Sequence, residues 1–350
     1  MVSIEIAGRR IGEDCLPFIV AEAGINHEGE FDKAIQLVDA AVAAGADCVK
    51  FQCHITEAEM IPTVIRPEGI STESLWDIIK RCELTEAEER SLKNYCEKSG
   101  IIYLCTPFSR EAADRLAAMD IPAFKIGSGE LNALPLIEHI AKMGKPMIVS
   151  TGMNGLKDIA QTVDLIRSHN IPLALLHCTS MYPTAFEDVR LNAITELAKA
   201  FAVPIGFSDH SPGIYAPLGA VALGACIIEK HFTISRSWPG PDNPMSLEPS
   251  DLAELVKGAK AVFKSKGGSK AALAGEQPVI DFAFASVVTL KEIGTGERFT
   301  LDNTWIKRPG TGPIHGRELD RVLNKRASRP IPANVAVDPK DIDNWGIRDS

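Results

Sequence analysis

From residue 17 onward the chain repeats one pattern: a short apolar run ending in polar residues, then a segment whose apolar residues recur at helical spacing. Such short runs are typical of buried parallel strands, and the segments between them predict helices. The predicted strands span residues 18–22, 47–51, 101–105, 123–127, 147–150, 173–177, 204–207 and 226–230. The predicted helices include residues 31–44, 85–99, 110–119, 135–143 and 156–169.

Eight such units over about 250 residues match the size of a closed parallel (β/α)8 barrel, the TIM barrel. An open doubly wound sheet is the alternative, but it would seldom need eight evenly spaced units. A longer excursion over residues 55–83 follows the second strand, and residues 251–264 are predicted to form the last barrel helix. The fold class is therefore α/β, with a TIM barrel first.

The composition changes after the predicted barrel. Residues 1–267 are assigned to the barrel, and the small, polar and glycine-containing residues 268–285 to a linker. Residues 286–350 are rich in β-branched residues and turn glycines, which predicts a small β-rich domain. A domain of about 65 residues buries little surface on its own, so we expect it to pack on the barrel or on another subunit.

The charge excludes one class of function. The 350 residues carry 37 Lys and Arg against 46 Asp and Glu, a formal net charge of −9, whereas nucleic-acid binding needs a basic surface. No window resembles a membrane span or a secretory signal, which predicts a cytoplasmic protein. The eight cysteines include no CxxC pair, so we expect neither a disulfide framework nor a structural zinc site. Cys48, Cys105 and Cys226 lie in predicted strands and should be buried.

Polar or ionisable residues stand at the end of every predicted strand. In a TIM barrel the catalytic residues come from the carboxyl ends of the strands, so these positions predict an active site. Each residue alone is equally well explained as a satisfied polar group, but the full set is not. The set is Glu22, Lys50, Gln52, Thr106, Lys125, Ser128, Ser150, His177, Ser208, His210, Glu229 and His231.

Two lysines and several hydroxyls indicate an anion site. Lys50 and Lys125 end even-numbered strands, so both ammonium groups can reach one ligand. Lys125 begins a Lys-Ile-Gly-Ser-Gly-Glu segment whose glycines let backbone N–H groups approach an anion while Ser128 donates a hydroxyl. Ser150 repeats that arrangement one strand later, and a phosphate with a nearby carboxylate would suit the site. The alternative is that one lysine only pairs with Glu22 or Glu130.

Two histidines indicate a metal site. His210 and His231 end the seventh and eighth strands, which are adjacent in a barrel, and neutral imidazoles suit a divalent Lewis acid. We expect the neighbouring Asp209 and Glu229 to orient the rings. The alternative is that both histidines are structural.

The remaining strand-end and loop residues carry weaker expectations. His177 is expected to pack in a barrel layer, whereas Tyr182 and Asp242 lie in loops where they could hydrogen-bond a polyol. His27 and His54 either line the mouth of the barrel or are solvated, and Cys53 is given no chemical role.

Taken together, these motifs resemble the sialic acid (nonulosonate) synthase family, phosphoenolpyruvate-condensing barrels followed by an antifreeze-like (SAF) domain. The similarity is greater to the bacterial branch than to human-type enzymes. The matching stretches are AEAGINHEG (21–29), VKFQ (49–52), TPFS (106–109), KIGSGE (125–130), STGM (150–153), LLHCTSMYPT (175–184), FSDHS (207–211), EKHFT (229–233), PGPD (239–242) and WIKRPGTG (305–312).

The resemblance implies a role for each matching position. Glu22 stands at the position of the catalytic acid–base glutamate, and His210 and His231 at those of the histidines that bind Mn²⁺ or Mg²⁺. The positions implied to bind phosphoenolpyruvate are Lys50, Thr106, Lys125, Ser128, Ser150 and Ser208. The positions implied near the sugar are Gln52, Tyr182, Asp242 and, from the SAF domain of a partner subunit, Arg308.

The implied reaction joins phosphoenolpyruvate, an open-chain 2-acetamido sugar (N-acetylmannosamine first) and water into a nine-carbon 2-keto acid and phosphate. The implied assembly is a homodimer that exchanges SAF domains. Ser180 replaces an asparagine common in N-acetylneuraminate-forming members, so legionaminate or pseudaminate synthesis from a diacetamido sugar is an alternative. Two further alternatives are condensation of a phosphorylated sugar and a carbohydrate-binding protein with an inert barrel.

Overall fold

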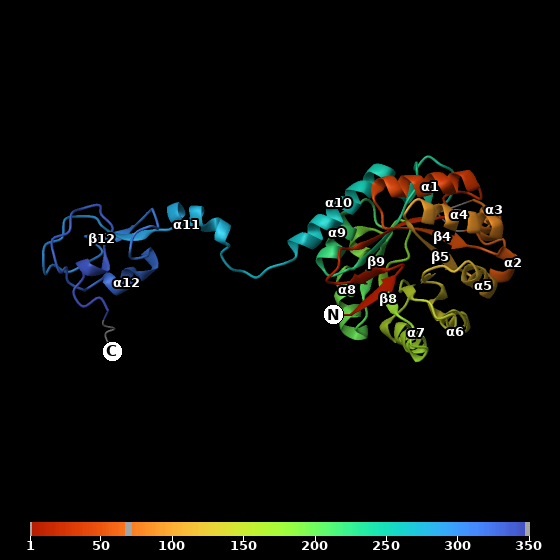
Figure 1. Cartoon of the computed structure of the whole chain (residues 1–350), viewed down its shortest axis with the longest axis horizontal. Coiled ribbons are helices and arrows are strands. Elements are labelled where there is room, and N and C mark those ends of the chain that lie inside the picture. The colour runs from red at the N-terminus through yellow and green to blue at the C-terminus, as the bar shows by residue number, and fades with distance from the viewer. Residues whose placement is uncertain (1, 67–71, 347–350) are drawn as a thin grey trace. The chain divides into compact units, whose positions relative to one another are not determined.

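The computed structural model describes residues 2–66 and 72–346. It divides into two compact units, Met1–Gly267 and Gly268–Ser350 (Figure 1). Each unit has a hydrophobic core of its own. The two units are therefore described separately.

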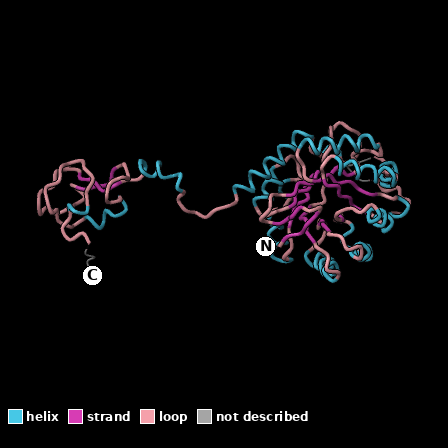
Figure 2. The backbone as a smooth tube through the Cα atoms, viewed as in Figure 1, coloured by secondary structure: helices cyan, strands magenta, loops and turns pink. Residues whose placement is uncertain are grey.

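The first unit is built on a closed barrel of eight parallel strands, with β10 paired to β3. The predicted TIM barrel is confirmed, and the open-sheet alternative is wrong. Figure 2 shows the strands surrounded by helices. The barrel strands are β3 (Phe18–Gly24), β4 (Cys48–Cys53), β5 (Ile102–Pro107), β6 (Phe124–Ile126), β7 (Met147–Ser150), β8 (Leu173–Cys178), β9 (Ile205–Asp209) and β10 (Ile227–His231).

The helices around the barrel bury one apolar stripe each. In α1, Ala34, Leu37, Val38 and Ala41 recur at helical spacing and are buried, and Gly45 ends the helix at a φ of 78°. The outer helices are α1 (Phe31–Ala44), α4 (Glu86–Lys98), α5 (Arg110–Ala118), α6 (Leu134–Ala141), α7 (Leu156–Ser168), α8 (Asn192–Phe201), α9 (Tyr215–Ala222) and α10 (Pro249–Ser265).

The predicted excursion after the second barrel strand contains two helices, α2 (Thr56–Glu59) and α3 (Leu75–Cys82). Residues 67–71 of this excursion lie outside the described residues. The Thr56 amide donates a hydrogen bond to the Glu83 carboxylate, which ties the start of α2 to the end of the excursion. Ile78 and Cys82 of α3 pack against Ile25, in the loop that follows β3.

An N-terminal hairpin, which the sequence pattern did not predict, precedes the barrel. Strands β1 (Ser3–Ile6) and β2 (Arg9–Gly12) pair antiparallel around a turn in which Ala7 and Gly8 both have positive φ. Ile4, Ile6 and Ile11 are buried in one cluster with residues from the first halves of the barrel strands, such as Phe18 and Cys48. The hairpin therefore covers the amino-terminal end of the barrel.

The second unit is a small domain whose only regular sheet, within the residues described, pairs β11 (Ser286–Thr289) with β12 (Thr304–Lys307). It also contains the short helix α12 (Leu319–Val322), and Val287, Phe299 and Val337 lie in its core. The predicted small β-rich domain is confirmed.

Part of the predicted linker is folded. Helix α11 (Gln277–Ala283) lies inside residues 268–285, and Gly310 N donates to Asp281 O at 2.7 Å. Gly316 N donates to Ala285 O, also at 2.7 Å. These backbone hydrogen bonds tie the second half of the predicted linker to the small domain, so the flexible part is shorter than expected.

All eight cysteines are free, and Cys48, Cys105 and Cys226 are buried as expected. No helix within the described residues is long and apolar enough to cross a membrane.

Candidate active site

The carboxyl ends of the barrel strands surround a cavity of about 550 Å³. The strand-end positions other than His177 converge there with Tyr182, as the sequence predicted. The predicted residues that line it are Glu22, Lys50, Gln52, Thr106, Lys125, Ser128, Ser150, Tyr182, Ser208, His210, Glu229 and His231. Asp242 lies beside this cavity, with Oδ2 3.7 Å from His231 Nδ1. Arg308 belongs to the second unit, where it follows β12 and is exposed.

Four buried charged side chains meet at the bottom of the cavity. Lys50 Nζ lies 2.7 Å from Glu22 Oε2 and 3.9 Å from Glu229 Oε2. Lys125 Nζ lies 3.7 Å from Glu229 Oε1. The two lysines converge as predicted, and Lys50 also pairs with Glu22, as the alternative proposed. The anion site itself stays a prediction. The two lysines come from β4 and β6, alternate strands whose inward side chains share a layer of the barrel.

The two carboxyl groups differ sharply in acidity. Burial raises the pKa of Glu22 to about 7, the negative charge of Glu229 adds to this, and Lys50 opposes it. Burial also opposes ionisation of Glu229, but Lys125, Lys50 and a hydrogen bond from Ser208 outweigh it and lower its pKa to about 2. The proton of this coupled pair therefore resides on Glu22, and Glu229 stays a carboxylate.

Hydroxyls and backbone amides surround the lysines. Lys125 Nζ donates to Ser150 Oγ at 2.7 Å, and Lys50 Nζ donates to Thr106 Oγ1 at 3.2 Å. Gly152 N donates to Ser128 Oγ at 3.0 Å. A Cβ at Gly152 would lie 2.8 Å from Ser128 Oγ and closer still to Ser180 Oγ, so only glycine permits this close approach. The result is a compact group of donors suited to an anion.

His210 and His231 face one another, with ring centroids 5.4 Å apart. His210 Nδ1 lies 2.9 Å from the Thr179 carbonyl oxygen, which can only accept, so Nδ1 donates and Nε2 is the ring nitrogen that does not take part in this bond. Burial lowers the pKa of His231, and its buried Nδ1 makes no hydrogen bond. Two facing imidazoles, one of which has an unpartnered buried nitrogen, fit a divalent metal ion.

The prediction that Asp209 and Glu229 orient these rings is wrong. Asp209 Oδ2 lies 2.5 Å from Lys230 Nζ, and Glu229 accepts from Ser208 and faces the lysines. The reason for Asp209 is strand alternation, which points its side chain to the opposite face from those of Ser208 and His210. The Thr179 carbonyl and Asp242 stand beside the histidines instead.

The set of candidate metal ligands is small. Among residues 2–66 and 72–346, no group of three or more His, Cys, Asp and Glu side chains is placed to hold a metal ion by itself. Water or substrate would have to supply the other ligands, which leaves the open positions that a Lewis acid needs.

Three weaker predictions are settled by packing. His177 hydrogen-bonds to the Val189 carbonyl at 2.7 Å and stacks on Phe207, as expected for a packed residue. His27 is buried behind the cavity against Phe51, whereas His54 lines the cavity. Burial raises the pKa of Cys53, which suits the absence of a chemical role.

Two residues of the cavity wall, Glu59 and Cys178, were not predicted from the sequence. Glu59, which lines the cavity and hydrogen-bonds to His54, lies in the excursion, where no strand pattern marks it. Cys178 lies 3.8 Å from His210 Nδ1. Cys178 directly follows His177 as the last residue of β8, and this strand-end position could have identified it as a residue of the cavity.

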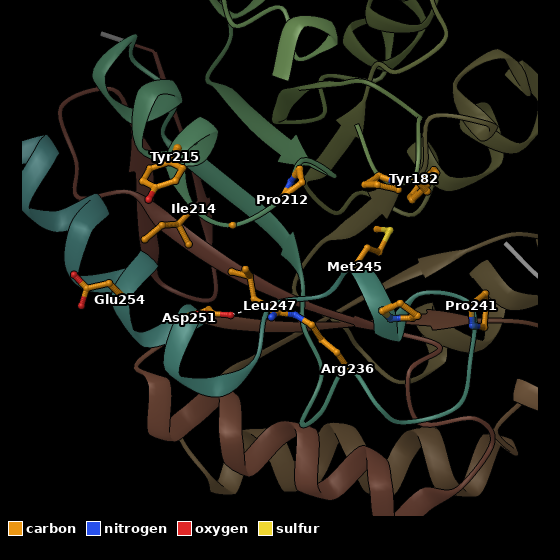
Figure 3. A pocket seen from close by; sticks show the side chains of 13 residues that line it. Tyr182, Pro212, Ile214, Tyr215, Arg236, Pro241, Met245, Leu247, Asp251 and Glu254 are labelled. Atoms are coloured by element: carbon orange, nitrogen blue, oxygen red, sulfur yellow. Dashed lines mark hydrogen bonds and ion pairs between the residues drawn. The ribbon is translucent and has the colours of Figure 1, made fainter. Parts of the chain in front are cut away.

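A second cavity of about 840 Å³ adjoins the first, and Tyr182 lines both. Figure 3 shows its lining, which comes from the loops after β8, β9 and β10 and from the starts of α9 and α10. Arg236 pairs with Asp251 at its edge, and Tyr215 is 78% exposed.

Comparison with known proteins identifies the family. A model described as the NeuB family matches residues 37–271, and a SAF domain model matches residues 284–343. The chain belongs to the NeuB family. Its second unit is a SAF domain.

Several NeuB-family relatives align along most of the chain. An uncharacterised protein of Methanocaldococcus jannaschii is 42% identical over 93% of this chain and 94% of its own length. The N,N'-diacetyllegionaminic acid synthase of Campylobacter jejuni is 38% identical over 89% and 96%. The crystal structure of N-acetylneuraminic acid synthetase from Leptospira borgpetersenii, 35% identical, superposes with a TM-score of 0.72 over 79% of this chain and 95% of that one. The chain is therefore an enzyme, and the inert-barrel alternative is wrong.

We expect one carboxyl of the NeuB-family barrel to titrate near pH 7. In ¹³C NMR of protein labelled at glutamate, Glu22 should show a midpoint of about 7 that is missing from Glu22→Gln. In Glu229→Gln the midpoint should fall by roughly 1 pH unit, because a like charge is removed and Lys50 is left to Glu22 alone.

The exposed Glu111 provides the control, since Glu111→Gln should leave the midpoint unchanged. The raised pKa also sets the sign of the effect on stability: the contribution of Glu22 to the free energy of unfolding falls as pH rises from 4.5 to about 7, then stays constant. Finding no carboxyl midpoint between pH 6 and 8 would contradict the assignment.

Proposed function

We propose that the enzyme condenses phosphoenolpyruvate with an open-chain 2-acetamido sugar and water, giving a nine-carbon 2-keto acid and phosphate. The observation that carries this proposal is the convergence of Lys50 and Lys125 with buried hydroxyls at the bottom of one cavity. Phosphoenolpyruvate has the phosphate and carboxylate that such a group of donors suits. The names of the relatives support a synthase of this kind.

In this reaction C3 of phosphoenolpyruvate attacks the aldehyde carbon, and a carbon–carbon bond forms while the aldehyde oxygen takes a proton. Water then adds to C2 and loses a proton, giving a tetrahedral C2 that carries a hydroxyl and the phosphate. The hydroxyl proton passes to the departing phosphate as the C2=O bond forms and the C2–O bond to phosphate breaks. Lys50, Thr106, Lys125, Ser128, Ser150 and Ser208 would hold phosphoenolpyruvate. Positive charge develops at C2, where the Glu229 carboxylate would stabilise it.

Glu22 is the group we assign to proton transfer. A pKa of about 7 lets a carboxyl both give and take a proton at neutral pH, whereas Glu229, with a pKa of about 2, stays ionised. Gln52 Nε2 donates to Glu22 Oε1 at 3.2 Å and so connects this acid–base group to the proposed sugar site.

We also propose that His210 and His231 hold Mn²⁺ or Mg²⁺. Such an ion supplies Lewis-acid polarisation of a carbonyl oxygen. Thr179, through its carbonyl, fixes His210 with Nε2 free, and Asp242 lies on the Nδ1 side of His231. Tyr182 packs its ring 4.2 Å from that of His210 and covers the pair on one side.

We propose two candidate sugar substrates, a first choice and an alternative. N-acetylmannosamine, which would give N-acetylneuraminate, is supported by the likeness to the Leptospira synthetase. A diacetamido-trideoxyhexose, which would give a legionaminate or pseudaminate, is supported by the Campylobacter relative and by Ser180. The apolar side chains that line the cavity, including Met60, Ile79 and Met153, would suit a deoxy carbon.

The assembly we propose is a cytoplasmic homodimer in which the SAF domain of each subunit covers the barrel of the other. Arg308 would then bind the sugar in the partner's site, since its five fixed donors suit hydroxyl and acetamido oxygens. The exposed position of Arg308 after β12 supports this proposal, as does the small core of the domain.

Phosphate release from phosphoenolpyruvate tests the function. We expect release with N-acetylmannosamine or a 2,4-diacetamido-trideoxyhexose, and little with N-acetylmannosamine 6-phosphate, because no basic residues are assigned to a second phosphate. Mass spectrometry of the keto acid identifies the product. No release with any of the three sugars, in enzyme supplied with Mn²⁺ or Mg²⁺, would contradict the proposed function.

Removal of metal should abolish this turnover without unfolding the barrel, because two imidazoles contribute little to the stability of a large core. Activity and circular dichroism are measured after chelation and again after addition of Mn²⁺. His210→Ala should be inactive under all these conditions, whereas His139→Ala, at a half-buried site on α6, should behave as wild type. Full activity of stripped enzyme together with active His210→Ala would refute the metal role.

Exchange of subunits tests the assembly. Arg308→Ala should lose activity while remaining folded and dimeric, and so should Glu22→Ala. A mixture of the two should recover about a quarter of wild-type activity, because half of the dimers are mixed and each has one intact site. The exposed Arg298→Ala serves as control for the SAF domain and should remain active. An active monomer, or no recovery after verified exchange, would contradict the exchanged dimer.

A further inference from the structure

A row of hydrogen bonds runs along one wall of the active-site cavity, from Glu22 to Glu59. Gln52 Nε2 lies 3.2 Å from Glu22 Oε1, and Gln52 Oε1 lies 2.9 Å from His54 Nε2. His54 Nδ1 lies 2.9 Å and 3.1 Å from the two carboxylate oxygens of Glu59. All four side chains line the cavity.

The chemistry of the partners fixes the direction of each bond. Gln52 Nε2 donates to Glu22 Oε1, the carboxyl oxygen that does not contact Lys50, so the amide oxygen of Gln52 is turned toward His54. That oxygen needs an N–H from His54 Nε2, and the Glu59 carboxylate needs one from Nδ1. Both ring nitrogens of His54 therefore donate, which makes His54 an imidazolium paired with the Glu59 carboxylate.

Burial favours an ion pair between His54 and Glu59 over a single charge on either residue. His54 is 3% exposed and the Glu59 side chain 5%, so either charge alone would be costly to bury. The His54 ring stacks on Phe108, with centroids 4.4 Å apart and planes 15° apart. This stacking fixes the plane in which the ring donates.

Three further titratable groups face His54 from other elements. Glu130, after β6, and Glu89, on α4, are carboxyls whose pKa values burial raises. His27, after β3, is kept neutral because burial lowers its pKa to about 4. The positive charge of His54 therefore lies near the carboxyl groups of Glu130 and Glu89, and the neutral His27 does not repel it.

The local fold explains how the three residues meet. Gln52 and His54 are two positions apart, at and just after the end of β4, which points both side chains to one face. Glu59 is the last residue of the four-residue helix α2, which begins soon after β4 (Figure 1). The first residue of this helix, Thr56, donates its backbone N–H to the Glu83 carboxylate.

We propose that His54 and Glu59 are positioning residues that hold the side-chain amide of Gln52 in one orientation at the sugar site. A flipped amide would place its NH₂ group against an N–H of the imidazolium, so the pair excludes that state. The sugar then always meets an amide of one polarity beside Glu22. This inference rests on the proposed function, because it assigns Gln52 to the sugar.

The protonation of His54 is tested without turnover. In ¹⁵N NMR of histidine-labelled enzyme at pH 7, the His54 ring, assigned by its loss in His54→Gln, should show two protonated nitrogens. Glu59→Gln should move the signal toward the neutral ring, and Glu59→Asp should move it less. A neutral His54 in the wild type would overturn the proposal, whatever reaction the enzyme catalyses.

A double-mutant cycle tests the positioning role. Glu59→Gln should raise the KM for the acetamido sugar roughly tenfold and leave the KM for phosphoenolpyruvate within about twofold. Gln52→Ala should raise the sugar KM as well, and adding Glu59→Gln to it should change nothing further, because the amide to be held is gone. Glu59→Asp should recover part of the loss.

The matched control is His139, whose ring pairs with Asp114 at 2.7 Å on the outer helices, so His139→Ala should leave both KM values unchanged. Melting temperatures identify any variant that fails to fold, and the cycle is then completed with Glu59→Asp. Additive effects of Gln52→Ala and Glu59→Gln, or equal changes in both KM values, would overturn the proposal. If the wild type releases no phosphate, the proposed function fails while the NMR result still decides the state of His54.

Discussion

The active site depends on the mutual pairing of four buried charges. Lys50, Lys125, Glu22 and Glu229 are each almost fully buried, and an ion buried alone would cost several kcal/mol. They come from β4, β6, β3 and β10, so only a closed barrel brings them within pairing distance. Closure of the sheet and assembly of the site are thus one requirement, since a sheet open between β3 and β10 would separate Glu229 from both lysines.

The same cluster separates the roles of its two carboxyls. Glu229 faces both lysines and a hydroxyl, whereas Glu22 faces one lysine and the amide of Gln52. Two glutamates in one site therefore have very different pKa values. Glu22 can act as an acid–base group while Glu229 provides a fixed negative charge. When Glu22 is protonated the cluster carries one net positive charge, and an anionic substrate can compensate for it.

The sequence predicted the barrel because buried parallel strands leave a strong signal: Phe18, Val49, Leu104 and Ile148 lie in apolar runs that no helical spacing explains. The positions at the strand ends followed from the same signal. The hairpin was missed because β1 and β2 have only four residues each, too few to show a clear pattern of buried positions. Helix α11 was missed because the residues around it are small and polar and its side chains are not buried.

Contacts between elements could not be predicted from spacing along the chain. Asp209 adjoins His210 in sequence yet pairs with Lys230. Asp242, more than thirty residues further along the chain, lies beside His231 instead. The His54–Glu59 pair depends in the same way on a short helix held by Glu83, which no periodic pattern indicates. Motif resemblance assigned most residues of the site, but the orientation of each side chain required the fold.

The N-terminal hairpin has a consequence for the order of events during turnover. It covers the amino-terminal end of the barrel, and the cavity lies at the other end, so both substrates and both products use the same opening. Lys50 and Lys125, which we propose to bind phosphoenolpyruvate, are almost fully buried, whereas Tyr182, proposed for the sugar, is 41% exposed. On that assignment, a sugar bound first would obstruct the path of phosphoenolpyruvate. Closing one end of the barrel with two short strands would then impose compulsory-order kinetics, with phosphoenolpyruvate entering before the sugar.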